Sequence, residues 1–156
     1  MTKQKLLVTA AALVVAINVF PTIARAGHCP PDKVGVDVTK PNSAAAKGVT
    51  DMVLGSIEVS QEPARIADRK FRLRKLVVQP NGVVPWHSHA DRPAIIYIVE
   101  GSITEYASNC AVPIAHKAGE IALETGATSH WWKNTSRAPA VLLSADLLHD
   151  EKDTNM

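Results

Sequence analysis

Aromatic side chains and cysteines are scarce in this sequence of 156 residues: phenylalanine, tryptophan and tyrosine together make up 4%, and there are 2 cysteines. The sequence has no Cys-x-x-Cys pair, no Gly-rich phosphate-binding loop and no Ser-His-Asp set in a recognisable context. It also lacks an internal repeat, a low-complexity segment and, beyond its first residues, a clear amphipathic helix. The motifs of dithiol redox proteins, P-loop proteins and serine hydrolases are therefore missing.

The first 26 residues have the pattern of a secretory signal peptide. Lys3 and Lys5 give a positive start, which an apolar stretch from Leu6 to Phe20 follows. Ala24-Arg25-Ala26 then offers the small residues that signal peptidase requires. The alternative is a membrane anchor, but a spanning helix needs about 20 apolar residues and this stretch is shorter. We therefore expect an exported protein, periplasmic or secreted, with no stable membrane anchor.

Removal of this leader changes the charge of the chain. The full sequence has 17 Lys and Arg against 15 Asp and Glu, a formal net charge of +2. Cleavage after Ala26 would leave 14 basic against 15 acidic residues, a net charge of −1. Neither value indicates a nucleic-acid surface or a membrane-binding patch, so we expect a small-molecule ligand and no nucleic-acid partner.

The two cysteines, Cys29 and Cys110, are far apart in the sequence. Export implies an oxidising compartment, in which a single disulfide is favoured over two free thiols. Such a bond would tie the N-terminal segment to the rest of the chain.

The hydrophobic pattern predicts one all-β domain. We expect an irregular N-terminal arm over residues 27–48, a β domain over 49–148 and a polar tail over 149–156. The predicted strands cover residues 52–59, 71–78, 83–89, 94–99, 102–106, 114–116, 121–124, 130–133 and 140–147. Many short strands separated by Gly, Pro and Asn turns favour a sandwich or a barrel.

Two histidines near the middle of the chain have the spacing of metal ligands. Residues i and i+2 of a strand point to the same face, so His87 and His89 project together. Imidazole binds zinc, copper, iron and nickel, and a third ligand must come from elsewhere. His130, at the start of a predicted strand, is the first candidate, with His28, His116 and His149 as alternatives. His116 precedes a Lys-Ala-Gly turn, so we expect it at the surface.

Two stretches of the chain resemble the two sequence motifs of the cupin superfamily. The first contains the His87–His89 pair and closes at Gly101, with Asn81 where an opening glycine is usual. Asparagine tolerates a positive φ better than most other residues, so the turn can form. The second motif begins at Gly119.

His130 and Asn134 match this second motif in identity and spacing, whereas Thr125 and Ala127 depart from it. The resemblance covers about residues 71–147. It implies a small jelly-roll barrel. It also implies that the histidines of both motifs, His87, His89 and His130, point inward and hold a divalent metal.

A carboxylate is missing from the first motif. The family places a glutamate seven residues before the closing glycine, and here that residue is Ala94. One alternative is a three-histidine site with open positions, as in cupins that resemble thiol dioxygenases; the other is a binding pocket without a metal. We favour a metal site for Fe, Mn, Zn, Ni or Cu, and expect its affinity to fall near pH 6.5, where histidine is protonated. Asp91 or Glu105 could supply an oxygen from outside the family position.

Several neighbours of the histidines are candidates for a substrate pocket. Trp132 has the same strand parity as His130 and is predicted to line the cavity. Ile96 and Ile98 share the inward parity of the following strand and would form its floor. Arg92 would bind a carboxylate, although a surface or structural salt bridge is the alternative.

The sequence thus predicts an exported cupin that binds one divalent metal and a small molecule. It is either a metal-dependent enzyme of dioxygenase, isomerase or decarboxylase type, or a non-catalytic binding or sensing protein. The resemblance also allows a homodimer. A fold shared by many chemistries does not name the reaction.

Overall fold

The computed structural model describes residues 27–126 and 128–149. The predicted signal peptide and all but the first residue of the predicted tail lie outside these residues. In the described part of the chain, no helix is long and apolar enough to cross a membrane.

The described residues form eight strands and two short 3-10 turns. Their order along the chain is η1 (Pro31–Lys33), β1 (Lys47–Glu58), η2 (Val59–Gln61), β2 (Lys70–Ser88), β3 (Ala94–Glu100), β4 (Ser102–Ala107), β5 (Ile114–Lys117), β6 (Ile121–Glu124), β7 (Ser129–Lys133) and β8 (Ala140–Leu148). The predicted all-β class is confirmed.

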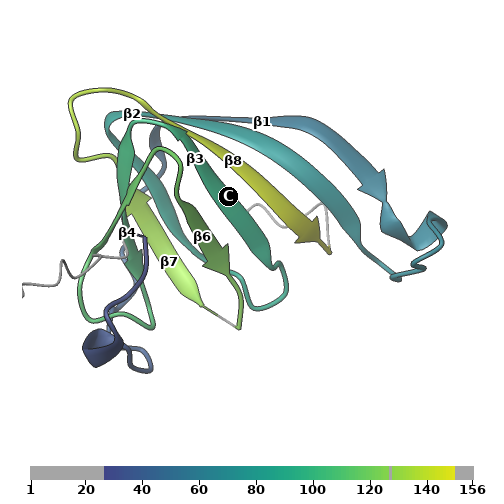
Figure 1. Cartoon of the computed structure of the whole chain (residues 1–156), viewed down its shortest axis with the longest axis horizontal. Coiled ribbons are helices and arrows are strands. Elements are labelled where there is room, and N and C mark those ends of the chain that lie inside the picture. Colours follow the sequence, from purple (N-terminus) through teal and green to yellow (C-terminus); the bar gives the residue numbers. More distant parts are fainter. Residues whose placement is uncertain (1–26, 127, 150–156) are drawn as a thin grey trace, which may run out of the picture.

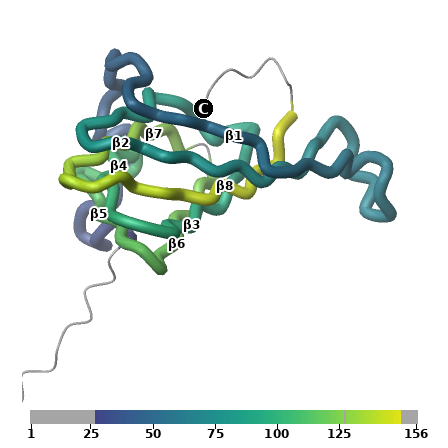
Figure 2. The backbone as a smooth tube through the Cα atoms, turned by 90° about the horizontal axis from the view of Figure 1, so that it is seen from above, coloured from purple at the N-terminus to yellow at the C-terminus, as the bar shows by residue number. Residues whose placement is uncertain are grey.

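The strands pair antiparallel in the order β5-β4-β7-β2-β8-β3-β6. Outside this order, β1 pairs antiparallel with β2. They curve into a nearly closed barrel, from which β1 and the start of β2 extend to one side (Figure 1). The view from above shows β1, β2, β8, β3 and β6 as consecutive neighbours (Figure 2). This is the jelly-roll arrangement expected from the sequence.

The long strand β2 belongs to both halves of the barrel. Its first half pairs with β1 and β8, and its second half with β7. The sequence predicts two strands with a turn between them, but one bent strand is found. Asn81 has the predicted positive φ, 61°, and it remains hydrogen-bonded, because its N–H donates to the carbonyl of Asn134 at 2.9 Å.

The side chain of Asn134 stabilises this bend through hydrogen bonds. Its side-chain amide donates to the carbonyls of Val78 and Ala138, both at 2.8 Å, and it is fully buried. Its Oδ1 accepts from the backbone N–H of Ser136 at 2.9 Å. The side chain of this motif asparagine therefore has a structural role, because it makes hydrogen bonds with backbone groups.

The core fills the barrel interior by strict alternation along the strands. On β8, every second residue from Ala140 to Leu148 is buried. The main hydrophobic cluster consists of Leu76, Val78, Val84, Ala94, Ile96, Ile98, Ile103, Ala122, Trp132, Ala140 and Leu142. Because apolar residues recur at every second position, one row of side chains on each strand lies inside the barrel.

The predicted disulfide is confirmed. Cys29 and Cys110 are bonded, with their Cα atoms 5.7 Å apart across a sequence separation of 81 residues. A bridge between Val34 and Cys110 adds backbone pairing to this link. In the chain-entropy picture, closing a loop of this length stabilises the fold by about 4–5 kcal/mol.

Candidate metal centre

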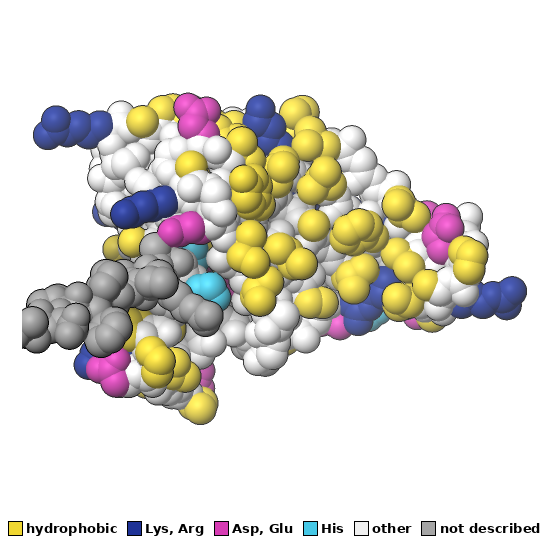
Figure 3. All heavy atoms as spheres, viewed as in Figure 1, with side chains coloured by type: hydrophobic (Ala, Val, Ile, Leu, Met, Phe, Trp, Pro, Cys, Tyr) yellow, Lys and Arg dark blue, Asp and Glu magenta, His cyan; other side chains and the backbone are white. Residues whose placement is uncertain are grey.

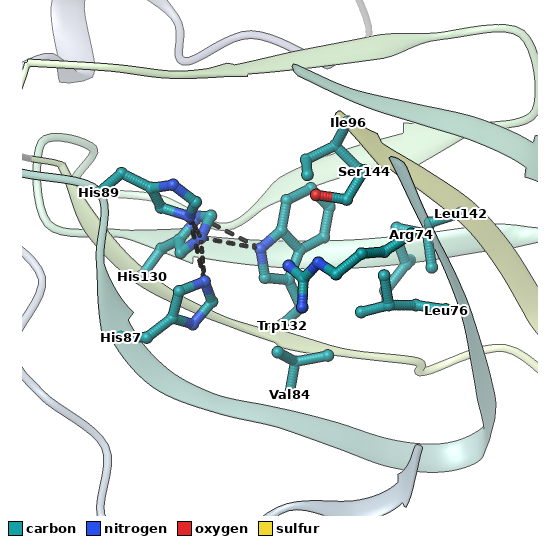
Figure 4. A pocket seen from close by; sticks show the side chains of 11 residues that line it. Arg74, Leu76, Val84, His87, His89, Ile96, His130, Trp132, Leu142 and Ser144 are labelled. Atoms are coloured by element: carbon teal, nitrogen blue, oxygen red, sulfur yellow. Dashed lines mark hydrogen bonds between the residues drawn. The ribbon is translucent and has the colours of Figure 1, made fainter. Parts of the chain in front are cut away.

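Three histidine side chains converge inside the barrel. His87 lies on β2, His89 directly follows that strand, and His130 on β7 is the cross-strand partner of His87. The Nε2 atoms are 3.1 Å apart between His87 and His89 and 3.0 Å apart in the other two pairs. Figure 4 shows the three rings turned toward one another at one end of a cavity.

The opposite nitrogen of each ring is held by an oxygen. Nδ1 of His87 donates to the carbonyl of Pro85 at 2.9 Å, and Nδ1 of His89 donates to the carbonyl of Arg92 at 2.7 Å. Nδ1 of His130 donates to a carboxylate described below. Since a carbonyl or carboxylate only accepts, each Nδ1 carries the proton and each neutral ring keeps a lone pair on Nε2. Three lone pairs therefore face one point, which is favourable around a cation.

The size of the triangle fits a first-row metal ion. Histidine nitrogens lie about 2.0–2.1 Å from zinc, so two ligands at right angles are about 3.0 Å apart and two at the tetrahedral angle about 3.3–3.4 Å. The observed separations of 3.0–3.1 Å match the right-angle case. The three donors therefore suit one face of a coordination sphere, with room for other ligands.

Burial keeps two of these rings neutral. Desolvation, reinforced by the repulsion that would act between the protonated forms of His87 and His130, lowers the pKa of His87 from 6.5 to about 2. The same two causes lower the pKa of His89 to about 4. Neutral imidazole is the form that binds metal, so these rings compete little with protons near pH 6.5. The expected fall in metal affinity therefore moves to lower pH.

Glu105, on β4, binds two histidines behind the triangle. Its Oε1 accepts from Nδ1 of His130 at 2.8 Å, and its Oε2 accepts from Nε2 of His116 at 2.9 Å. Burial works to raise the pKa of Glu105, but the two hydrogen bonds outweigh it and lower the pKa to about 2. The ionised carboxylate thus orients His130 from its far side, as carboxylates do around metal-ligating histidines. Its oxygens do not face the three Nε2 atoms.

The prediction that His116 lies at the surface is wrong. Its side chain is 0% exposed and lies 4.8 Å from Trp132, ring centre to ring centre. On β5, Ile114 and His116 have the same parity and both point inward. The turn after His116 is correctly predicted. The inward direction of the His116 side chain could have been predicted from Ile114, which has the same strand parity.

Two carboxylates flank the position where the family glutamate is missing. Ala94 is buried, and its cross-strand partners are Glu124 on β6 and Asp146 on β8. Glu124 Oε2 lies 3.2 Å from Nδ1 of His130, again on the far side of that ring. Burial, followed by the charge of Glu105, raises the pKa of Glu124 to about 9.

Both carboxylate oxygens of Asp146 bind arginine side chains. Its two oxygens accept from Nε and Nη2 of Arg72 at 3.0 and 2.7 Å, and Nε of Arg74 lies 3.4 Å away. The described carboxylates near Ala94 therefore face other partners than the three Nε2 atoms.

The cavity beside the triangle is small, about 30 Å³. Its walls are Arg74, Leu76, Val84, His87, His89, Ile96, Ile103, His130, Trp132, Leu142 and Ser144. Trp132 points its indole N–H at the imidazole of His130, 3.2 Å from Nδ1 and 3.3 Å from Nε2. Trp132 and Ile96 thus occupy the predicted position.

The structure does not place Arg92 and Ile98 in that wall. Ile98 is 0% exposed and packs in the hydrophobic core, one inward position beyond Ile96. Arg92 is buried too, and its contact with the histidines is made by its backbone carbonyl, which accepts from His89.

The cavity instead contains an arginine that the sequence did not single out. Arg74 is 6% exposed, and its Nη1 donates to Asp51 at 2.5 Å. Ser144 beside it has a buried hydroxyl without a hydrogen-bond partner among the described residues. The signal for Arg74 was its parity with the apolar Leu76. Figure 4 shows both polar side chains across the cavity from the histidines.

The remaining candidates lie elsewhere. Asp91 is exposed and pairs with Arg69 at 2.6 Å and with His149 at 2.5 Å. His28 is exposed. None of these three polar residues, Asp91, His28 or His149, belongs to the triangle.

No curated protein matches this sequence, but many solved structures share its fold. A protein with a double-stranded β-helix domain from Klebsiella pneumoniae has a TM-score of 0.53 at 14% identity, over 72% of this chain and 85% of that one. The cupin domain of an XRE family transcriptional regulator from Enterobacter cloacae has a TM-score of 0.51 at 11% identity, over 64% and 96%. The cupin domain of Schizosaccharomyces pombe Cnp3 has a TM-score of 0.50 at 14% identity, over 69% of this chain and 66% of that one, just under two thirds.

A family model also matches the chain directly. The model, described as a cupin domain, covers residues 74–146, which include all three histidines of the triangle. Family model, fold and the predicted sequence motifs agree. Residues 74–146 of this chain therefore form a cupin domain.

Proposed function

We propose that this protein binds one divalent metal ion through His87, His89 and His130 and presents it to a small anionic molecule. One observation carries the proposal: three Nδ1–H groups are held by oxygens, so three Nε2 lone pairs converge at 3.0–3.1 Å. Such a set of neutral donors is costly to bury without a cation.

The ligand is proposed from the charges around the cavity. The three ligands are neutral, so a divalent ion would keep its full charge and favour an anion beside it. Across the cavity, the buried Arg74 guanidinium and the Ser144 hydroxyl offer further polar contacts. The cavity of about 30 Å³ restricts the ligand, or the part of it that enters, to a few atoms. A carboxylate group meets these conditions.

The bound metal would supply Lewis-acid chemistry or a binding position for oxygen. The chain's own residues would hold and orient the ion, and Trp132, Ile96 and Leu142 would limit the water around it. Isomerase, decarboxylase or dioxygenase activity is the catalytic form of the proposal.

A second candidate function is a non-catalytic metal- or ligand-binding protein. It is favoured by Ala94, which stands where the family motif has a glutamate, and by Glu105, whose oxygens are both engaged behind His130. Neither residue is available as a general base at the open side of the triangle.

We also propose that the protein works outside the cytoplasm. The Cys29–Cys110 disulfide is compatible with an oxidising compartment, and the leader pattern in the sequence points to export.

Metal content tests the site. Untagged protein should carry close to one equivalent of a transition metal, measured by mass spectrometry, and His130→Ala should carry almost none. The matched control is His149→Ala, which removes an exposed histidine outside the triangle. Equal, near-zero content in wild type and His130→Ala, before and after loading with Zn²⁺, Mn²⁺ or Fe²⁺, would contradict the proposal.

Cobalt-loaded protein tests the ligand class. The visible absorption of bound Co²⁺ should shift on titration with acetate but not with its neutral analogue acetamide. Ser144→Ala should weaken the acetate response several-fold while leaving the metal content unchanged. An equal response to acetate and acetamide would contradict the anionic ligand and leave the metal site intact.

A further inference from the structure

A second group of polar side chains lies inside the barrel, behind the triangle of histidines. Glu105 and Glu124 approach His130 from the side of its Nδ1 atom, opposite to the other two rings. On β6, Leu123 is exposed among the hydrophobic side chains that Figure 3 shows over the outside of this region, whereas Glu124 points inward and is 1% exposed. A cavity of about 160 Å³ adjoins both carboxyl groups. We call it the rear cavity, and its lining includes Gly27, Cys29, Glu105, Ile114 and Glu124.

Two buried atoms of this group have no hydrogen-bond partner among the described residues, namely Nδ1 of His116 and Oε1 of Glu124. The ring of His116 is fully buried, and its Nε2 donates to Glu105 at 2.9 Å. Since a carboxylate only accepts, Nε2 carries the proton and the neutral ring keeps a lone pair on Nδ1. A buried acceptor without a donor costs free energy. The region around His116 therefore favours the binding of a group that donates hydrogen bonds.

The backbone of Gly27 lies beside the unpartnered nitrogen of His116. A Cβ atom added to Gly27 would be 3.3 Å from Nδ1 of His116 and 3.5 Å from a carboxylate oxygen of Glu120. Gly27 is itself buried and lines the rear cavity together with Glu105 and Glu124. Its φ of 90° is one that glycine adopts without strain. Hydrogen-bond acceptors thus surround the residue at which the exported chain is predicted to begin.

Gly27 is held in place by residues that remain after removal of the leader. Its backbone N–H donates to the carbonyl of Ala115 on β5 at 3.0 Å. Two residues later, Cys29 forms the disulfide with Cys110. Figure 1 shows the segment that follows, in purple, beside β4. The start of the arm is therefore fixed against the barrel wall.

We propose that the rear cavity binds the α-ammonium group that cleavage after Ala26 creates on Gly27. Hydrolysis of this peptide bond consumes one water, leaves a carboxylate on the leader and leaves an amino group on Gly27, which takes up a proton. Before cleavage the Gly27 nitrogen has one N–H, and Ala115 accepts it. After cleavage it has three N–H donors and a positive charge. One donor keeps the bond to Ala115, and the others become available to His116 Nδ1 and to the carboxylate of Glu120.

The surroundings favour this ammonium over other cations. Glu105, Glu120 and Glu124 provide acidic groups around Gly27, and a buried ammonium needs such partners. Free amines and ions lose translational freedom on binding, whereas the Gly27 nitrogen is already attached to the cavity wall. A metal ion is the alternative occupant, because Glu105, Glu124 and His130 offer three possible ligand atoms within 4.8 Å of one another.

The ammonium would complete a chain of hydrogen bonds that reaches the triangle of histidines. His116 would accept from the ammonium through Nδ1 and donates to Glu105 through Nε2. Glu105 in turn accepts from Nδ1 of His130 at 2.8 Å. Removal of the leader would thus place a positive charge two side chains behind a proposed metal ligand. The inference rests on the proposed export and does not require a bound metal.

Acylation of the α-amino group tests the proposal. Untagged, exported protein should have the mass of a chain that begins at Gly27. Near pH 7, acetic anhydride modifies α-amino groups ahead of lysines, because their ordinary pKa is about 7.7–8.0 against about 10.4. In folded wild type the α-amino group should react roughly 10-fold or more slowly than in urea-unfolded protein, since local opening must come first.

The matched variant has one extra glycine between Ala26 and Gly27, which moves the amino group out of the rear cavity. It should remain folded by circular dichroism, and its α-amino group should react equally fast in the folded and the unfolded protein. Glu120→Gln removes one charge beside the ammonium and should raise the reaction rate of folded protein several-fold. The control is Glu62→Gln, which changes an exposed glutamate in another part of the chain and should leave the rate unchanged.

Two results would overturn this proposal alone. One is a chain that begins at Gly27 and whose amino group reacts equally fast folded and unfolded, which would mean that the rear cavity does not hold it. The other is a wild type with two equivalents of metal, of which His87→Ala keeps one, which would assign Glu105 and Glu124 to a second ion. A mass that places the first residue elsewhere would contradict the predicted leader removal as well, so the two failures are distinguishable.

Discussion

The two ring nitrogens of His130 lie in opposite surroundings. On the Nε2 side are two other imidazoles and the cavity. On the Nδ1 side are two buried carboxyl groups, those of Glu105 at 2.8 Å and Glu124 at 3.2 Å. The negative charge of Glu105 thus lies behind His130 and not among the three Nε2 atoms. The comparison teaches that a site without a carboxylate at its open side can keep negative charge one ring away.

The largest effect should come from removing the carboxylate behind His130. Glu105→Ala would leave the buried donors of His116 and His130 without their acceptor, and we expect a loss of about 3–5 kcal/mol of unfolding free energy. Glu105→Gln keeps one acceptor oxygen and should cost less stability, while metal affinity falls roughly 10–100-fold. Chemical denaturation and competitive metal titration measure the two effects. Unchanged metal affinity in a folded Glu105→Gln variant would mean that the far side of the ring does not influence the near side.

The titrating groups on the two sides of His130 give opposite pH dependences of the unfolding free energy. The pKa values of His87 and His89 are lowered, so the unfolded chain binds more protons below pH 6.5 and metal-free protein loses stability as the pH falls. The pKa of Glu124 is raised from 4.5 to about 9, so between these pH values the folded chain holds a proton that the unfolded chain has lost, and this contribution to stability falls as the pH rises. Below pH 6.5 the two histidines outweigh it, and above pH 6.5 the contribution of Glu124 remains. The stability of metal-free protein should therefore be greatest near pH 6.5, with about 1.4 kcal/mol per pH unit for each proton.

Glu124→Gln separates the two limbs of this profile. The amide does not titrate, so the decline above pH 6.5 should disappear, while the decline below pH 6.5 remains and becomes steeper. The measurement is urea denaturation from pH 5 to 9 in the presence of a chelator. Retention of the alkaline decline in Glu124→Gln would assign it to another group.

Ala94→Glu places a carboxylate at the position where the family motif has a glutamate. Because Glu124 and Asp146 are the cross-strand neighbours of this position, we expect the metal-free variant to lose about 1–3 kcal/mol from charge burial. Added metal should raise its melting temperature more than that of the wild type, since a fourth, anionic ligand offsets half of the charge of a divalent ion. Ala94→Gln is the control for size. A smaller metal-induced shift in Ala94→Glu than in Ala94→Gln would show that the side chain does not reach the ion.

The smallest effect should come from Trp132→Phe. The change removes the indole N–H that points at His130 and keeps an aromatic ring in the cavity wall. We expect a loss of about 0.5–1.5 kcal/mol in stability and little change in metal content. A large loss of metal would give Trp132 a role in positioning His130 that its contact does not indicate.

The three histidines were predictable because their signals are local. The i, i+2 spacing of His87 and His89 fixes their common direction, and the second motif adds His130. The all-β class follows from short runs and turn residues in the same way. The disulfide was expected because export makes two cysteines pair.

The residues around the triangle were harder to predict, since strand pairing brings them together across the chain. Glu105 meets His116 and His130 from 11 and 25 residues away, and no local pattern predicts those distances. Arg74 and His116 could have been assigned inward by parity with Leu76 and Ile114. The position of Arg92 required the loop geometry, because its carbonyl rather than its guanidinium meets His89.

The bent strand β2 has a consequence for which insertions and deletions this gene can tolerate. One strand connects the outward-facing Phe71 to His87 of the histidine triangle, passing the positive φ of Asn81 and an irregularity between Val84 and His87. Adding or removing one residue in a strand turns every later side chain to the other face. A single-codon insertion between Asn81 and His87 would leave the pairing of the first half of β2 intact and turn His87 away from His89 and His130. Length variation in this lineage should therefore concentrate in residues 59–69, between β1 and β2, and avoid the segment from 79 to 87.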